Sequence, residues 1–94
     1  YKHIIKKGDT ANVATLEKLM QATLSGTQDR NIRFSDLQKV LTTLGFQCRI
    51  RGDHFIYWKN GIDEIINLQP DGSKAKPYQV RQVRNLILKY HLEV

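Results

Sequence analysis

The fold is decided by residues 46–61, which read FQCRIRGDHFIYWKNG. Up to Arg51, apolar and polar residues alternate, and this period of two predicts a half-buried strand in which Cys48 is a small core residue. Gly52 and Asp53 then indicate a turn, since both residue types favour tight chain reversals. The chain is therefore expected to fold back on itself directly after the first strand.

A second strand follows the turn, from His54 to Lys59, where the run HFIYWK is rich in aromatic and β-branched residues. Asn60 and Gly61 form a strong signal for a short hairpin, because both tolerate a positive φ. A third strand at 64–69 would then complete an antiparallel meander. The meander is expected to end at the turn-forming residues 70–73.

Two helices are predicted before the meander. Apolar residues recur at helical spacing over residues 13–25, and Gly26 ends the pattern. The second helix, at 36–44, is predicted to begin with a capping box formed by Ser35 and Gln38. Residues 1–12 have no sustained period and are expected to form an arm or a short strand.

A third helix is predicted after the meander, because Pro77 suits a first helical turn and apolar residues recur from Val80 to Tyr90. The expected order is α-α-β-β-β-α. We therefore predict an α+β fold, a two-layer sandwich in which two helices cover one face of a three-stranded antiparallel sheet. Residues 13–94 would form this single domain, and the other sheet face would stay open.

The composition limits the function. A chain of 94 residues, 40% apolar and 26% charged, fits one small globular domain and leaves no room for a two-domain cofactor enzyme. No apolar run approaches the roughly 20 residues of a membrane helix, so we expect a cytoplasmic protein without a membrane partner. With Cys48 as its single cysteine and no metal-ligand spacing, the chain is expected to need no metal or other cofactor.

The charge predicts an acidic partner. Fifteen Lys and Arg face nine Asp and Glu, giving a net charge of +6, and nucleic acid is the leading class of partner for such a domain. The C-terminal segment contains a basic stripe with no acidic residue between its members. This stripe consists of Lys74, Lys76, Arg81, Arg84 and Lys89. Exposed helices usually mix signs, so the stripe favours phosphate binding over a merely solvated face.

Three histidines are candidate acid–base groups. His3 lies in the unpatterned arm, and His91 lies in the last turn of a helix, where the helix dipole favours a cation. His54 begins a strand directly after a turn, where a side chain can be exposed and still be held by a rigid backbone. From spacing alone, a structural histidine remains the more frequent explanation. Ile56 and Trp58 share the face of His54, so Trp58 is a candidate for stacking on an unpaired base.

Four segments carry a family resemblance across about two thirds of the chain, from Asn31 to His91. They are residues 35–46, 52–57, 66–70 and 74–84, and the last of them is long and distinctive. In these segments the chain resembles the HicA family, the small toxins of bacterial type II toxin–antitoxin pairs. The resemblance implies a fold like that of double-stranded-RNA-binding domains and an activity as a ribosome-independent mRNA interferase. It also implies an acidic, HicB-like antitoxin as partner.

In that family the active-site histidine stands in a Gly-Ser-His motif, and the corresponding residue here is His54. Asp53 stands where many members have Ser, and Phe55 where many have a second His. The implied chemistry is a metal-independent endoribonuclease reaction, in which the imidazole takes the proton of a ribose 2′-OH. Cationic side chains would bind the RNA and stabilise the phosphorane. The candidates are Lys74, Lys76, Arg81, Arg84, Arg49 and Arg51.

Two further functions remain open from the residues themselves. The same basic surface would suit a double-stranded-RNA-binding module without catalysis. It would equally suit an interaction protein that binds an acidic protein partner.

Overall fold

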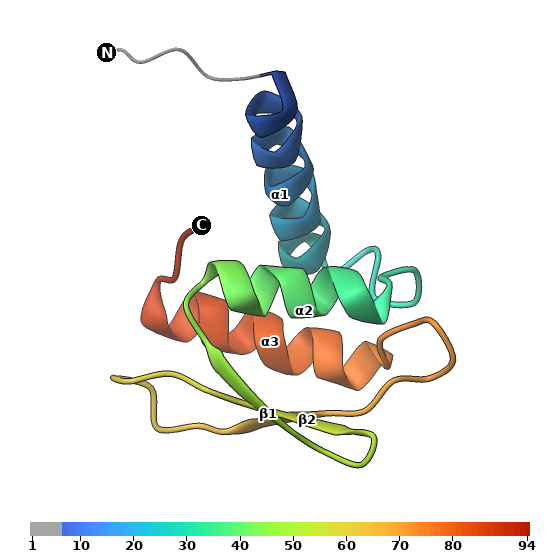
Figure 1. The fold of residues 1–94 in the computed structure, drawn as a ribbon, viewed down its shortest axis with the longest axis vertical. Coiled ribbons are helices and arrows are strands. Elements are labelled where there is room, and N and C mark those ends of the chain that lie inside the picture. Colours follow the sequence, from blue (N-terminus) through green and yellow to red (C-terminus); the bar gives the residue numbers. More distant parts are fainter. Residues whose placement is uncertain (1–6) are drawn as a thin grey trace.

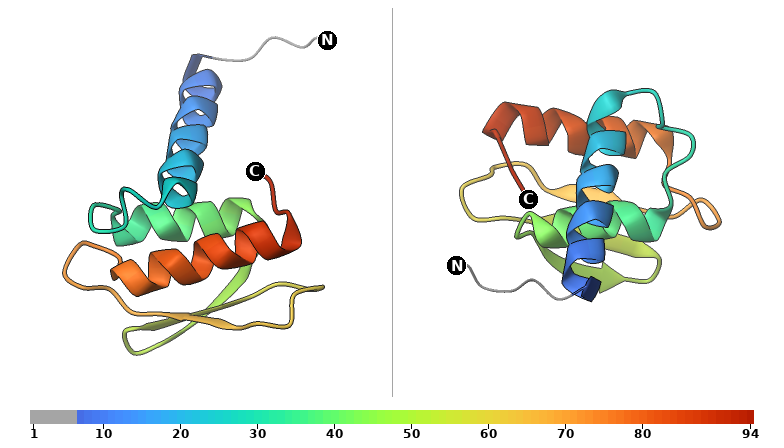
Figure 2. Two further views of the ribbon diagram at one scale, coloured as in Figure 1. Left: turned by 180° about the vertical axis from the view of Figure 1, so that it is seen from behind. Right: turned by 90° about the horizontal axis from the view of Figure 1, so that it is seen from above.

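The computed structural model describes residues 7–94 and confirms the predicted α+β fold (Figure 1). Its elements are α1 (Lys7–Ser25), α2 (Phe34–Thr43), β1 (Gln47–Arg51), β2 (His54–Trp58), β3 (Ile66–Leu68) and α3 (Pro77–Tyr90). The strands form one antiparallel sheet in the order β1-β2-β3. α2 and α3 lie side by side over one sheet face, and α1 rises from this helix layer (Figures 1 and 2).

The register of the sheet follows from a two-residue turn between β1 and β2. Arg51 pairs with His54 across this turn, and Tyr57 of β2 pairs with Ile66 of β3. Gly52 takes the first turn position with a φ of 61°. Such a glycine matches the right-handed twist of the two strands, which is why tight hairpins favour it.

The connection from β2 to β3 is longer than the predicted two-residue hairpin. It spans residues 59–65, and the Ile62 N–H donates to the Lys59 carbonyl (3.1 Å), closing a turn that contains Gly61 with a φ of 89°. Because the loop continues beyond this turn, β3 begins only at Ile66.

The core lies between the sheet and the helix layer. Phe34 and Phe55 meet edge to face there, with ring centroids 5.1 Å apart. The most deeply buried apolar side chains come from α2, β2, β3 and α3: Leu37, Val40, Leu41, Tyr57, Ile66, Leu68, Val80 and Val83. β2 and β3 therefore contribute alternate residues to the core, as a strand with one open face requires.

The prediction of a half-buried first strand is wrong. No residue of β1 is buried, Cys48 is exposed, and Ile50 keeps 60% of its surface accessible. β1 is one of the two edge strands, and its side chains stay outside the core cluster although their sequence alternates. Cys48 is thus a surface thiol and not a core residue.

The predicted capping box at the start of α2 is also wrong. The N-cap is Arg33, whose side chain makes no capping hydrogen bond, and Ser35 lies inside the helix. A distant segment supplies the missing partner, because the Phe34 N–H donates to the Ser73 carbonyl (2.9 Å). The Ala75 N–H donates in turn to the Ile32 carbonyl (2.9 Å), so residues 32–34 and 73–75 fasten the starts of α2 and α3 together.

α1 begins at Lys7 and not at Val13, so residues 7–12, predicted as part of an arm, belong to the helix. Nothing in this stretch forbids a helix, since it holds no proline and only one glycine. Residues 1–6, including His3, lie outside the described residues. Gly26, with a φ of 76°, follows the end of the helix as predicted.

Glu64 ties the loop between β2 and β3 to the end of α3. Its Oε2 accepts a hydrogen bond from Lys89 Nζ (2.7 Å), and its Oε1 accepts one from the Tyr90 hydroxyl (2.6 Å). These two bonds, that from Lys89 first, lower the pKa of Glu64 from 4.5 to about 2. The stabilisation is therefore complete above pH 4.5 and is lost as the pH falls towards 2.

We predict that Glu64→Gln lowers the melting temperature at pH 7 and that this difference shrinks steadily below pH 4.5. The amide cannot carry the charge that Lys89 pairs with, and at pH 2 the wild-type carboxyl has also lost half of its charge. Thermal denaturation followed by circular dichroism at several pH values measures the effect. Glu17→Gln, on the exposed surface of α1, is the control. A pH-independent difference would contradict the role given to the ion pair.

Candidate functional site

The open face of the sheet, which no helix covers, carries side chains from all three strands. Residues that pair directly across an antiparallel sheet point to the same side. Arg51 therefore lies beside His54, Arg49 beside Ile56, and Asn67 on the other side of Ile56. The sheet thus presents a cationic row on β1, a mixed imidazole and apolar row on β2, and an amide on β3.

His54 lies on this face with its side chain half-exposed. Its Nδ1 lies 3.2 Å from Asn67 Oδ1, and its Nε2 lies 3.6 Å from Asp53 Oδ1. With Asn67 Oδ1 as the acceptor, the proton of a neutral imidazole would sit on Nδ1 and the lone pair on Nε2. A separation of 3.6 Å is too long for a hydrogen bond, and the side chain is 48% exposed. Nε2 is therefore available to a molecule from solvent.

Asp53 is itself positioned by a chain of polar side chains that begins at Lys76, the residue before α3. Gln69 Nε2 donates to Asp53 Oδ2 (2.7 Å), and Gln69 Oε1 accepts from Lys76 Nζ (3.5 Å). The hydrogen bond from Gln69 is the main cause that lowers the pKa of Asp53, and the charges of His54 and Lys76 act in the same direction. The ionised Asp53 carboxylate thus places a negative charge beside His54 Nε2.

Two adjoining hollows lie on the open face. The first is lined by Arg51, Gly52, His54, Ile56 and Asn67, and the second by Arg49, Ile56, Trp58 and Ile65. Ile56 lines both, so the two hollows are neighbours along β2. The predicted site residues His54, Arg51 and Trp58 are therefore brought together on one surface.

The predicted basic stripe does not form one surface. Lys76 reaches the His54 site through Gln69, and Lys74 is exposed in the preceding turn, where its backbone pairs with Asp71. Arg81 is exposed on α3, in the helix layer. Only the N-terminal part of the stripe is thus connected to the open face.

Arg84 makes contacts that stabilise the fold. Its guanidinium holds both carboxylate oxygens of Asp29, at 2.8 and 3.2 Å, and also donates to the Thr23 carbonyl of α1 (3.2 Å). The side chains of this ion pair are only 16% and 13% exposed. Lys89 is likewise paired, with Glu64. The basic stripe has no acidic residue within its own segment, but Asp29 and Glu64 from earlier parts of the chain pair with two of its members.

Sequence reasoning missed Asn67 and Gln69 as members of the site. Asn67 stands between Ile66 and Leu68, which are both fully buried. Because side chains alternate along a strand, this pattern alone places Asn67 on the open face. Its contact with His54 needs the register of β2 against β3, which the sequence does not fix.

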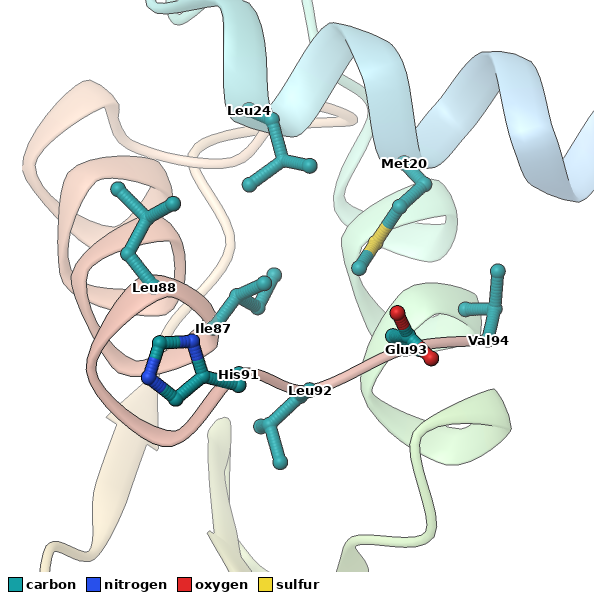
Figure 3. Close-up of a pocket in the computed structure, with 8 residues that line it drawn as sticks. All are labelled: Met20, Leu24, Ile87, Leu88, His91, Leu92, Glu93 and Val94. Atoms are coloured by element: carbon teal, nitrogen blue, oxygen red, sulfur yellow. The ribbon is translucent and has the colours of Figure 1, made fainter.

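Another hollow lies at the far end of the helix layer, between α1 and the end of α3 (Figure 3). Met20 and Leu24 of α1 and Ile87 and Leu88 of α3 line it, together with residues 91–94 after α3. Its lining is mostly aliphatic, and it contains none of the residues of the His54 site.

No family model matches the chain, and comparison with curated proteins and with solved structures likewise finds no match. Within residues 7–94, no helix has the length and apolar character needed to cross a membrane. In the same part of the chain, no three His, Cys, Asp or Glu side chains are grouped as ligands for a metal ion. The geometry of the open face is thus the main guide to function.

We predict that Arg84→Ala lowers the free energy of unfolding by about 3 kcal/mol, because it leaves the largely buried Asp29 carboxylate without its partner. Urea denaturation measures this loss. Arg81→Ala, an equal change on the exposed side of α3, should stay within about 0.5 kcal/mol of wild type. Equal losses in the two variants would contradict the assignment of Arg84 to the fold.

We further predict that Gln69→Leu raises the pKa of Asp53 towards its usual value, because the variant loses the main hydrogen bond to the carboxylate. An NMR titration of the Asp53 carboxyl carbon measures the shift. Gln47→Leu, the same substitution at the other end of the open face, is the control and should leave the titration unchanged. An unaltered pKa in Gln69→Leu would mean that this bond does not form in solution.

Proposed function

We propose that this protein is a metal-independent endoribonuclease that cleaves mRNA, with His54 as its general base, and that it is the toxin of a type II toxin–antitoxin pair. The observation that carries the proposal is the half-exposed imidazole of His54, whose Nε2 lies 3.6 Å from the Asp53 carboxylate and whose strand position pairs with Arg51 of β1. The resemblance of four sequence segments to the HicA family supports the same function.

The geometry suits an attack by the ribose 2′-oxygen. Nε2 of neutral His54 takes the proton of the 2′-OH, and the freed oxygen attacks the adjacent phosphorus. The bond to the 5′-oxygen breaks, leaving a 2′,3′-cyclic phosphate, and the 5′-oxygen leaves as a hydroxyl with a proton from solvent. Arg51, beside His54 in the sheet, stabilises the charge on the phosphorane. Asp53 stabilises the imidazolium in the same step.

The acidic partner implied by this function would occupy the same face. A HicB-like antitoxin that contacts Arg49 and Arg51 would cover His54 and exclude RNA without any conformational change. Opposite charges would make its association fast and sensitive to salt.

One observation favours a second candidate, an RNA-binding module without catalysis. The acidic group that contacts His54 is Asp53, and its lowered pKa keeps it ionised, so it does not donate a proton to the leaving oxygen. The sheet face and its cations would then serve RNA binding alone.

We predict that His54→Gln lowers the rate of RNA cleavage about 10²- to 10⁴-fold, the usual contribution of a general base. The melting temperature should hardly change, because the imidazole is half-exposed. The assay incubates purified protein with a defined mRNA in the presence of EDTA and detects 2′,3′-cyclic phosphate ends.

His91→Gln is the matched control, since His91 lies at the opposite end of α3 and follows its last turn. Cleavage by His54→Gln at the wild-type rate would refute the role of His54. A wild-type protein that binds RNA without cutting it would favour the binding module instead.

A further inference from the structure

We propose that the open sheet face binds RNA only where it is unpaired, with one base stacked on Trp58 in the hollow beside that of His54. This inference rests on the proposed function for the position of the cut. Binding itself requires no catalysis, so the two can fail separately.

The hollow around Trp58 has the character of a base-binding site. Ile56 and Ile65 line it together with Trp58, and Ile65 is 63% exposed, although large aliphatic side chains usually gain by burial. Trp58 is half-buried, so its ring is anchored in the sheet and still offers a surface to solvent. A flat aromatic ring that is held in place by packing and partly exposed to solvent is suited to stacking with a nucleobase.

The charges around the hollow fit a phosphate backbone. Arg49 lines the hollow and Arg51 lines the next one, and the three strands contribute no acidic side chain. Among residues 7–94, neither guanidinium makes a salt bridge, whereas Arg84 and Lys89 in the helix layer are both paired. Within the described part of the chain, Arg49 and Arg51 are thus cations without a salt bridge on β1, next to the strand that carries His54 and Trp58.

A double helix does not fit this arrangement. In A-form RNA the base faces are covered by their neighbours, and the major groove is too deep and narrow for side chains. Stacking on a sheet-borne indole therefore requires a base that has left its helix. The carboxylates of an acidic protein could pair with the arginines but would offer nothing specific to the apolar hollow. Unpaired RNA offers phosphates to the arginines and a base to the hollow, so it explains both features of the surface.

The spacing sets a minimum length for the ligand. His54 and Trp58 are four residues apart on one strand, which corresponds to about 13 Å. One nucleotide does not span this distance, so the stacked base belongs to a neighbour of the cleaved nucleotide. A mononucleotide should then gain nothing from occupying both hollows.

The test uses the intrinsic fluorescence of Trp58, the only tryptophan of the chain. The probe is a 2′-O-methyl oligoadenosine, which cannot be cleaved because it lacks the 2′-OH. We expect it to quench the fluorescence, and we expect its duplex with oligouridine of the same chemistry to bind at least 10-fold more weakly. AMP should bind far more weakly than the oligomer.

Variants separate stacking from general charge attraction. Trp58→Leu should weaken binding of the single strand about 10- to 100-fold, and Trp58→Phe should restore most of the affinity, both measured by fluorescence anisotropy of a labelled probe. Tyr78→Leu is the control, because Tyr78 is an exposed aromatic residue on α3, in the helix layer and not on the open sheet face. Circular dichroism verifies that each variant is folded.

Three results would overturn the inference: duplex binding as tight as that of the single strand, equal losses in Trp58→Leu and Tyr78→Leu, or quenching by polyglutamate but not by RNA. If the single strand binds and quenches while mRNA stays intact, the inference stands and the proposed function fails. If mRNA is cleaved without quenching, the inference alone fails.

Discussion

The pairing of Arg51 with His54 across a two-residue turn sets the register of β1 against β2, and the entire open face depends on it. Side chains alternate along a strand, so a slip of one residue would send every side chain to the other face. His54 and Trp58 would then point into the core, and Tyr57 into solvent. Core packing disfavours such a slip, because it would remove Phe55 and Tyr57, the β2 residues that pack against the helix layer, from the core.

The helix layer, in turn, is held by contacts between residues far apart in the chain. The Arg84–Asp29 pair joins α3 to the linker after α1, and the backbone bonds between residues 32–34 and 73–75 join the starts of α2 and α3. The backbone bonds involve Ile32, Phe34 and Ala75, which belong to the core cluster, and the Arg84–Asp29 pair is itself largely buried. They fix how the helices lie over the sheet, and so they also fix where Lys76 and Gln69 meet Asp53.

The sequence predicted the element order, the fold class and the face shared by His54 and Trp58, since these depend on local periodicity. It failed where the answer depends on distant partners. Cys48 alternates like a core residue but lies on an edge strand, and Ser35 resembles a helix cap although the backbone of Ser73 takes that place. The basic stripe has no acidic residue within its own segment, but Asp29 and Glu64, which are distant in sequence, pair with two of its members. The contacts of Asn67 and Gln69 with the site needed the register of β3, which no local pattern reveals.

The exposed edge strand β1 has a consequence for solubility. Its outer side presents unpaired backbone N–H and C=O groups, and such edges invite strands from other molecules to add to the sheet. Arg49 and Arg51 oppose this, because a second copy joining edge to edge would bring like charges together. The protection is electrostatic and therefore weakens as the salt concentration rises. The same row of arginines thus also protects against aggregation, and neutralising it would leave the open edge and the already exposed Ile50 without charge repulsion.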